Sequence, residues 1–468
     1  MERAEAEAIY DAGREAVVEV LLAMDRRIQQ LEARVEKLER ELSKSSRNSS
    51  RPPSSDPPGS MARSKDPSGR KRGAQDGHEG HGRPLLPAWA VDEIVEHRPA
   101  RCGCGHVFRG DDEMVGESAR HQVEELPPIN VRVIEHRCER LRCPACGKRT
   151  RAVLADEFAR SCFGPRLEAA VATLSVRNRI SRRDAVELCE ELFGSRISTG
   201  TVDAILTRTS EALSDPHSDL LEQLRSSSAV NMDETGWRRA GERRALWGIF
   251  DERHGYLHVA KDRHEDHAKE LLADTKAIVT SDRWWAYSHL PLKRRQLCWA
   301  HLKRDFAAHA EGLGGEKEFG ERGLELCERV FWASEVFKHT ADRHALQLTV
   351  QQLQREYKPV IRGYATKRAR NRHCRGMARN LLKAWPALWT FAKHPGVEPT
   401  NNHAERALRS AVIYRKLSFG SQSEGGELRT ARMFSAHTTC RLQRRSLFVY
   451  LTEALSASAR GDPAPLLS

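Results

Sequence analysis

The 468-residue sequence lacks long apolar runs and is poor in aromatic residues. Hydrophobic residues make up 39% of it, aromatic residues 6% and charged residues 30%. No run approaches the roughly 18 apolar residues that a membrane span needs. Met1 to Tyr10 also lack the apolar segment and small-residue cleavage site of an export signal. We therefore expect a cytoplasmic protein with no membrane partner.

Cysteines and acidic residues are also in short supply. The 11 cysteines of so large a chain, without an export signal, favour reduced thiols or metal ligands over a disulfide framework. The 65 Asp and Glu face 77 Lys and Arg, which gives a net charge of +12. This surplus predicts a polyanionic partner, most often nucleic acid, and hence association with the nucleoid. A basic protein with no nucleic-acid role is the alternative.

What the sequence does have begins with a segment, residues 17–42, that repeats apolar side chains every seven residues. The two apolar positions of the repeat are occupied by Leu21, Ile28, Val35 and Leu42 and by Val17, Met24, Leu31 and Leu38. Arg27 and Glu32 stand at flanking positions where opposite charges bridge two parallel helices. The pattern predicts a coiled coil that forms a parallel homodimer. The alternative is a lone amphipathic helix packed on its own core.

Four cysteines follow a linker rich in Ser, Pro and basic residues, residues 44–83, which we expect to be disordered. They form two pairs, Cys102 with Cys104 and Cys143 with Cys146. A tight turn ending in Gly points two thiolates at one ion, and two such pairs close a tetrahedral site for a structural Zn²⁺. Because the first pair is C-x-C, His106 and Cys138 are alternative ligands. Residues 121–137 alternate like a hairpin, so we expect a small zinc-binding β module, with free thiols in such a module as the alternative.

Residues 165–215 have helical spacing throughout. Ser181 is predicted to cap a helix that Gly194 ends, and Ser198 or Thr199 to cap the next. Two short helices around a Gly-containing turn resemble a helix-turn-helix. A DNA-reading role and a plain helical connector both fit this pattern.

After Ser228 the periodicity becomes that of strands. We predict strands at residues 229–233, 245–250, 256–259 and 277–280, with a helix over 264–273. Three hairpin-linked strands, a helix and a strand are the order of a ribonuclease H-like α/β core. A right-handed crossover can lay the fourth strand parallel to the first.

The first and fourth of these strands each run into an acid, Asp233 and Asp282. Carboxylates at adjacent strand ends repel unless cations lie between them, as a two-metal phosphoryl-transfer site requires. We therefore predict a catalytic site there with two Mg²⁺ ions; ordinary turn acids are the alternative.

A third acid is needed, and Glu405 opens a helix in the segment TNNHAER. Glu405 lies three residues after Asn402, the spacing of a capping box, so a cap role is the alternative to metal binding. Arg409 and Lys416 fall on the same helix face as Glu405, which suits a metal that holds a DNA phosphate.

These motifs together resemble a known family. The heptad helix, the SSRNSSRPPSSD linker, the cysteine pairs, MDETGWR, SDRWWAY, CWAHLKRDF, NNHAERALR and RKLSFGS are similar, in order, to the insertion-sequence-66 (IS66) family of bacterial DDE transposases. The resemblance implies that Asp233, Asp282 and Glu405 coordinate divalent metal. It also implies that the partners are double-stranded DNA, at the element's terminal inverted repeats and at the target, and possible element-encoded accessory proteins. The first cysteine pair departs from the family's usual C-x-x-C.

The 122 residues between Asp282 and Glu405 have helical spacing, which implies an inserted helical subdomain. Within them, residues 362–383 carry eight Lys or Arg and no acid, which favours phosphate contact over a solvated helix face. His301 is expected either near the scissile phosphates or in the core. The predicted DNA contacts are Arg304, Arg368, Arg370, Arg372, Arg375, Arg409, Arg415 and Lys416.

The preferred interpretation is a transposase that cleaves and joins DNA with two Mg²⁺ ions and acts as a homodimer or higher homo-oligomer. One alternative is a zinc and coiled-coil DNA-binding regulator with an inactive nuclease core, and another is a ribonuclease H-like resolvase or nuclease. The expected parts are a coiled coil (1–45), a linker (46–88), a zinc module (89–155), a helical DNA-binding region (156–222), a catalytic domain (223–432) with an insertion at about 300–395, and a C-terminal helical region (433–468).

Overall fold

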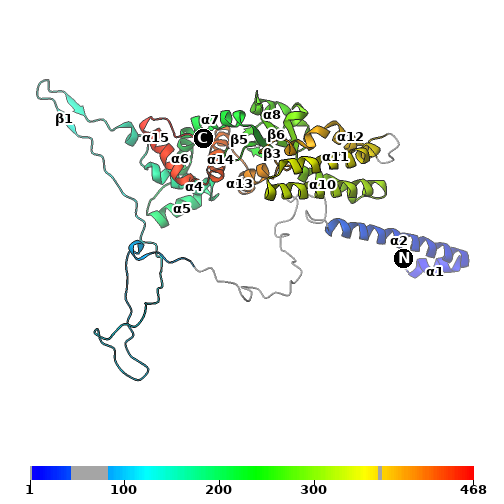
Figure 1. The fold of residues 1–468 in the computed structure, drawn as a ribbon, viewed down its shortest axis with the longest axis horizontal. Helices are drawn as coiled ribbons and strands as arrows, with labels where there is room; N and C mark the ends of the chain where they lie inside the picture. Colours follow the sequence, from blue (N-terminus) through cyan, green and yellow to red (C-terminus); the bar gives the residue numbers. More distant parts are fainter. Residues whose placement is uncertain (1–2, 44–82, 367–371, 468) are drawn as a thin grey trace. The chain divides into compact units, whose positions relative to one another are not determined.

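The computed structural model describes residues 3–43, 83–366 and 372–467. Most of the predicted linker lies outside these residues. The chain divides into a larger unit of residues 1–57, 134–191 and 195–468 and a smaller unit of residues 58–133 and 192–194. Helices and one main sheet make the larger unit a mixed α/β structure (Figure 1).

The main sheet has five strands in the order β5-β4-β3-β6-β7. They are β3 (Ala229–Arg239), β4 (Glu242–Phe250), β5 (Gly255–Ala260), β6 (Ile278–Ser281) and β7 (Arg295–Leu297). β3, β4 and β5 pair antiparallel, whereas β6 pairs parallel to β3 and to β7. Helix α8 (Glu265–Leu272) connects β5 to β6, as the sequence predicts.

The first strand of the sheet is longer than predicted. β3 continues past Asp233 to Arg239, because its register with β4 runs unbroken to the pair Arg239 and Glu242. Ala240 and Gly241 both have positive φ, 48° and 88°, which is the conformation of a tight two-residue hairpin turn. The prediction that this strand ends at Asp233 is therefore wrong. Its parallel pairing with β6, however, ends at Asn231.

Helices precede and follow the sheet in the sequence. They are α3 (Asp156–Ala159), α4 (Pro165–Val176), α5 (Arg182–Phe193), α6 (Thr199–Ala212), α7 (Ser214–Ser226), α13 (Asn402–Ser418), α14 (Glu424–Leu442) and α15 (Leu447–Arg460). Two predicted caps are confirmed: Ser181 Oγ accepts from the Asp184 amide at 3.2 Å, and Ser198 Oγ from the Thr201 amide at 3.1 Å. α14 lies along β5, where its Ser435 hydroxyl accepts the Leu257 amide at 2.8 Å.

A helical insertion follows β7. It consists of α9 (Trp299–Ala310), α10 (Gly315–Thr340), α11 (Arg343–Tyr364), α12 (Arg372–Lys383) and the short 3-10 helices η5 (Trp385–Leu388) and η6 (Thr390–Ala392). The insertion begins directly after the sheet, since β7 ends at Leu297 and Trp299 begins α9. α9 and α10 approach closely at Gly320, which has no side chain. A Cβ added there would lie 2.1 Å from the backbone nitrogen of Ala310.

The cysteine-containing segment forms less sheet than predicted. Residues 121–137 contain no strand, so the predicted hairpin there is wrong. Alternation alone does not make a strand when no neighbouring backbone pairs with it. A short hairpin of β1 (Arg140–Arg142) and β2 (Arg149–Arg151) instead surrounds the second cysteine pair. η2 (Ala88–Ala90) is a 3-10 helix earlier in the chain.

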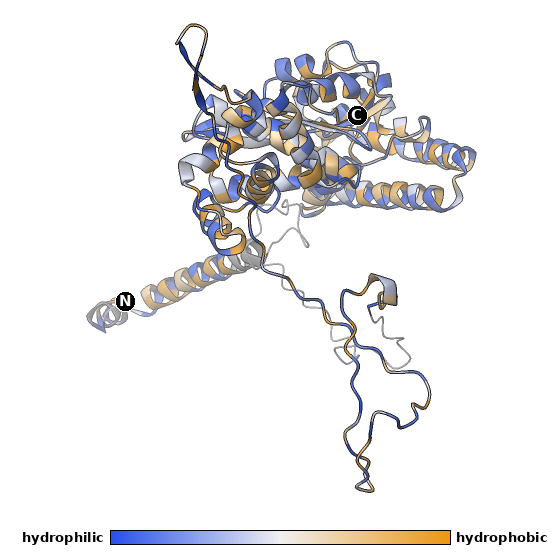
Figure 2. Cartoon of the chain, turned by 90° about the vertical axis from the view of Figure 1, so that its left-hand side faces the viewer, coloured by the Kyte–Doolittle hydropathy of each residue, from blue (hydrophilic) through white to orange (hydrophobic). Residues whose placement is uncertain are grey.

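The N-terminal segment forms two helices, α1 (Arg3–Asp11) and α2 (Arg14–Ser43). Apolar positions recur along α2 (Figure 2). Three seam residues are exposed in the single chain: Leu21 by 60%, Ile28 by 51% and Val35 by 52%. Among the described residues, no helix is long and apolar enough to cross a membrane.

We predict that this exposed seam mediates dimer formation. In a peptide of residues 1–45, replacing Ile28 and Val35 by Asp should give monomers, because burying charges in a dry seam costs several kcal/mol. The double change Gln29→Asp and Gln30→Asp adds the same charge off the seam and should leave the dimer intact. Light scattering measures the mass, and an unchanged mass for the seam variant would contradict the prediction.

Candidate active site

Asp233 and Asp282 lie at the same end of two neighbouring parallel strands. The last parallel pair of β3 and β6 is Asn231 with Thr280, so each acid lies two residues beyond that pair. The Trp284 amide donates to Asp282 Oδ1 at 2.8 Å, which holds this carboxylate in a tight turn. The sheet therefore brings both predicted acids to one edge.

Glu405 is brought to the same edge by the residue before α13. The side chain of Asn401 is fully buried; it donates to the Met232 carbonyl at 2.8 Å and accepts from the Asn231 side chain at 3.0 Å. The backbone amide of Asn401 also donates to Cys298 Sγ at 3.1 Å. Asn401 thus ties the first turn of α13 to the strand that carries Asp233.

Asp233 lies within the electrostatic influence of the other two predicted acids, Asp282 and Glu405. Burial raises this pKa well above its usual value, and the negative charges of Glu234, Asp282 and Glu405 raise it further. Like charges held together favour protonation or a bound cation. Carboxylate oxygens are the ligands that Mg²⁺ prefers, so this group of acids fits a divalent metal site.

The geometry does not support the capping-box role of Glu405. α13 begins at Asn402, which makes Asn401 the N-cap residue, and the Asn401 side chain forms no capping bond because it is bonded to β3. Glu405 is therefore one position too far along the helix for a capping box. Its carboxylate is partly exposed and lies 3.8 Å from His301 Nδ1.

A fourth acid, Glu234, was missed by sequence reasoning. It follows Asp233 on β3, and alternate residues of a strand point to opposite faces. Burial and the charge of Asp282 raise its pKa to about 7, although Tyr287 Oη at 2.5 Å and Arg263 Nη2 at 2.6 Å donate to it. The MDET segment shows the acid, but nothing in the sequence identifies its two partners.

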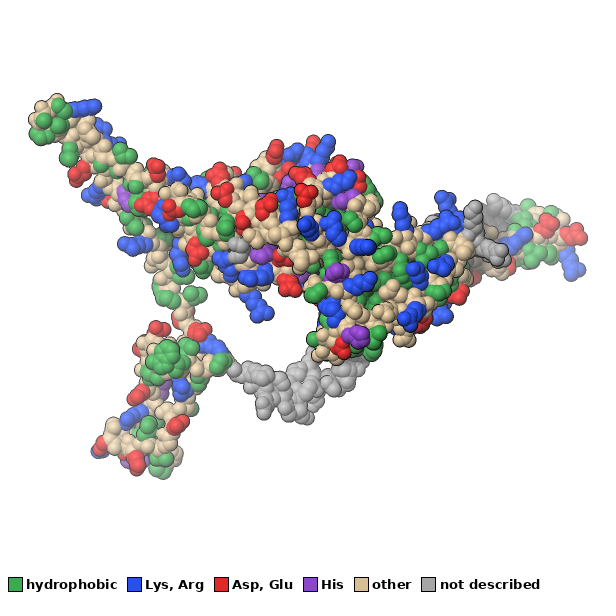
Figure 3. Space-filling view, turned by 45° about the horizontal axis from the view of Figure 1, so that its top comes forward, with side chains coloured by type: hydrophobic (Ala, Val, Ile, Leu, Met, Phe, Trp, Pro, Cys, Tyr) green, Lys and Arg blue, Asp and Glu red, His purple; other side chains and the backbone are tan. Residues whose placement is uncertain are grey.

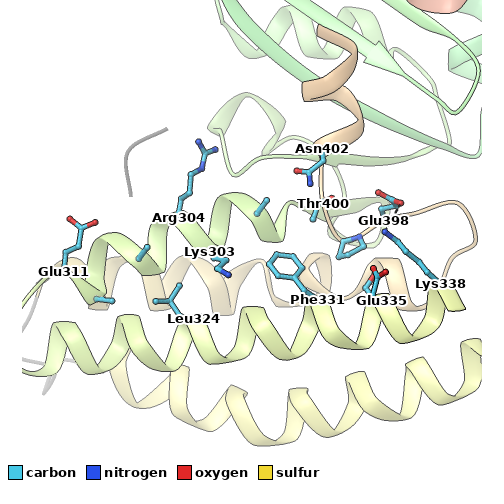
Figure 4. A pocket seen from close by; sticks show the side chains of 15 residues that line it. Lys303, Arg304, Glu311, Leu324, Phe331, Glu335, Lys338, Glu398, Thr400 and Asn402 are labelled. Atoms are coloured by element: carbon cyan, nitrogen blue, oxygen red, sulfur yellow. Dashed lines mark ion pairs between the residues drawn. The ribbon is translucent and has the colours of Figure 1, made fainter. Parts of the chain in front are cut away.

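His301 and Arg304 lie on α9, and His301 is the neighbour of Glu405. Burial and the Arg304 charge lower the pKa of His301. Arg304 lines a cavity of about 780 Å³ between α9, α10 and the segment before α13. In Figure 4 the Arg304 side chain points away from the side of α9 on which Leu324 lies. Lys338 and Glu398, which also line the cavity, form an ion pair at 3.8 Å. The structure thus places His301 next to Glu405 and Arg304 at the neighbouring cavity.

The predicted DNA contacts on α13 separate into two kinds. Arg409 and Lys416 are exposed, as Glu405 is. Arg415 instead donates to the Gly236 carbonyl and to Thr235 Oγ1, the latter at 3.2 Å, so it joins α13 to β3. Arg415 therefore has a structural partner in addition to any role toward DNA.

The remaining predicted contacts belong to the helical insertion. Arg372 is exposed and Arg375 half-buried on α12, whereas Arg368 and Arg370 lie outside the described residues. On the face shown in Figure 3, Lys and Arg side chains are numerous and interspersed with acidic ones.

Each cysteine pair forms a turn suited to holding a metal. Gly105 N donates to the Cys102 carbonyl at 2.9 Å, and Gly147 N to the Cys143 carbonyl at 2.8 Å. Hydrogen bonds from the Cys104 backbone and thiol lower the pKa of Cys102, and bonds from the Cys146 and Ala145 backbones lower that of Cys143. Low thiol pKa values favour the thiolate that binds Zn²⁺, so each pair is suited to supply two of the four ligands of a zinc site.

Comparison with known proteins gives three family matches. Residues 160–428, more than half of the chain, match the family described as "Transposase IS66 family". Residues 99–147 match the "zinc-finger binding domain of transposase IS66", which supports zinc binding by the cysteine segment, and residues 2–84 match the "Family of unknown function (DUF6444)". A relative from Sinorhizobium fredii (strain NBRC 101917 / NGR234), "Uncharacterized protein y4hP", is 25% identical over 421 residues, covering 81% of this chain and 74% of its own length.

The buried position of Asn401 predicts a measurable stability effect. Asn401→Ala should lower the free energy of unfolding by about 1–3 kcal/mol, because it removes the side-chain partner of the buried Met232 carbonyl and of the half-buried Asn231 amide. Asn402→Ala, one residue further on, should change it by no more than about 0.5 kcal/mol. Urea unfolding compares the two variants, and equal effects would show that Asn401 does not tie the helix to the strand.

The cysteine turns predict a specific loss of zinc. In the full chain, Cys143→Ser should lower the bound zinc by one ion per chain, since a closed thiolate site needs all its ligands. Cys138→Ser, outside the two pairs, is the matched control and should retain the metal. Elemental analysis of protein purified without chelator measures both, and equal zinc contents would contradict the assignment.

Proposed function

Since the chain belongs to the Transposase IS66 family, we propose that it is the transposase of an insertion sequence, which binds the two ends of its element and cleaves and joins DNA there. The observation that carries this proposal is the convergence of Asp233, Asp282 and Glu405 at one edge of the sheet. The net charge of +12 suits a DNA partner.

The catalytic core is of the ribonuclease H-like class. The order β5-β4-β3-β6-β7 supports this, because three antiparallel strands are followed by two that run parallel to the first. In this arrangement the strands supply Asp233 and Asp282, and a helix that packs on them supplies Glu405. The fold therefore assembles the site from segments far apart in the sequence.

Asp233, Asp282 and Glu405 would hold two Mg²⁺ ions, which when bound supply charge stabilisation for an in-line displacement at phosphorus. Arg304, Arg409 and Lys416 would orient the phosphates of the bound strand by charge. Burial and the neighbouring carboxylates raise the pKa of Asp233, so a metal that binds it would displace a proton, and metal affinity should increase with pH.

The exposed seam of α2 supports a homodimer that brings two active sites to two element ends. The cysteine segment and the helices α4 to α7 are the further candidates for DNA binding. A regulator with an inactive core would bind the same DNA without cutting it, and a resolvase would not require the terminal repeats. Cleavage of DNA that carries the inverted repeats flanking the gene separates these functions.

The decisive prediction concerns the three acids. Asp233→Asn, Asp282→Asn and Glu405→Gln should each reduce Mg²⁺-dependent nicking and strand joining by orders of magnitude, because an amide keeps the size but loses the charge that binds metal. End binding in Ca²⁺ should persist. Gel assays on labelled end DNA measure cleavage and binding separately.

The same variants distinguish a catalytic from a structural role. Asp233→Asn relieves repulsion among neighbouring acids, so its melting temperature should equal or exceed that of the parent. Glu252→Gln, at an exposed acid in the loop between β4 and β5, is the matched control and should remain active. Full activity in Glu405→Gln would remove Glu405 from the site.

A further inference from the structure

A second group of metal-binding residue types lies in the helical insertion, apart from the acids and the cysteine pairs. Among the described residues, His309, Glu316 and Cys374 are the group of three or more whose ligand atoms come within 4.8 Å of one another. His309 lies in the last turn of α9, Glu316 in the first turn of α10, and Cys374 in the first turn of α12. The group thus joins three helices.

The distances within this group suit a single ion. His309 Nδ1 lies 3.0 Å from Glu316 Oε1 and 3.9 Å from Cys374 Sγ. Ligand atoms around a tetrahedral zinc ion, with bonds of about 2.0–2.3 Å, are separated by roughly 3.3–3.7 Å. Both observed separations therefore need only small adjustments to meet at one metal.

The setting is partly buried. Cys374 is 1% exposed, and the side chains of His309 and Glu316 are exposed by 14% and 24%. The close approach of α9 and α10 at Gly320 fixes the two helix ends that carry His309 and Glu316.

We propose that His309, Glu316 and Cys374 bind one Zn²⁺ ion that fastens the start of α12 to the α9–α10 hairpin. Imidazole and thiolate ligands select zinc over Mg²⁺, and three protein ligands leave one position for water. The ion would fix the basic helix α12 in place. This site is separate from the catalytic acids, since His309 follows His301 by about 12 Å along α9.

The test is zinc stoichiometry in the full chain carrying Cys143→Ser and Cys146→Ser, which removes one cysteine pair from the count. In this background, Cys374→Ser and His309→Gln should each lower the bound zinc by one ion per chain. Cys327→Ala, at another buried cysteine of the same insertion, is the matched control and should retain it. Circular dichroism checks that each variant is folded.

Two further readouts keep the result independent of folding and of DNA cleavage. In the same background, Co²⁺ should give a thiolate charge-transfer band that Cys374→Ser removes and Cys327→Ala keeps. Chelation should increase hydrogen exchange at the start of α12 in the background protein but not in Cys374→Ser. Equal zinc contents in all variants, or an equal loss in Cys327→Ala, would overturn the proposal without affecting the role of the three acids.

Discussion

The buried side-chain amide of Asn401 is the interaction on which the candidate site depends. An amide can donate and accept at once, so Asn401 satisfies the Met232 carbonyl and the Asn231 side chain with one group. It adds no charge to a place where several acids already repel one another. A carboxylate at this position would lose the donor and add to that repulsion.

The fold holds several acids at a place where their ionised forms are disfavoured. Asp233 and Glu234 both have raised pKa values, and burial is the largest cause for each. Such a group destabilises the free protein and favours whatever supplies positive charge. The hydrogen bonds from Tyr287 and Arg263 to Glu234 offset part of this cost on one face of β3, while the Asp233 face remains available to metal.

Close packing of α10 against α9 holds the helical insertion together. At Gly323, as at Gly320, α10 leaves no room for a side chain, since a Cβ there would lie 1.9 Å from the ring of Phe306. This packing sets the position of α9, and α9 carries His301 and Arg304 at one end and His309 at the other. One rigid helix therefore connects the surroundings of Glu405 to the proposed zinc site.

The sequence by itself determined the features that depend on neighbouring residues. The caps at Ser181 and Ser198, the order of strands and helices after Ser228 and the family motifs all follow from local spacing. Tertiary structure alone decided what depends on distant partners. The length of β3 was set by its pairing with β4. The alternation at 121–137 was not sufficient for a hairpin, since no strand forms there. The roles of Asn401, Glu234 and the group at His309 depend on partner residues that only folding brings within bonding distance.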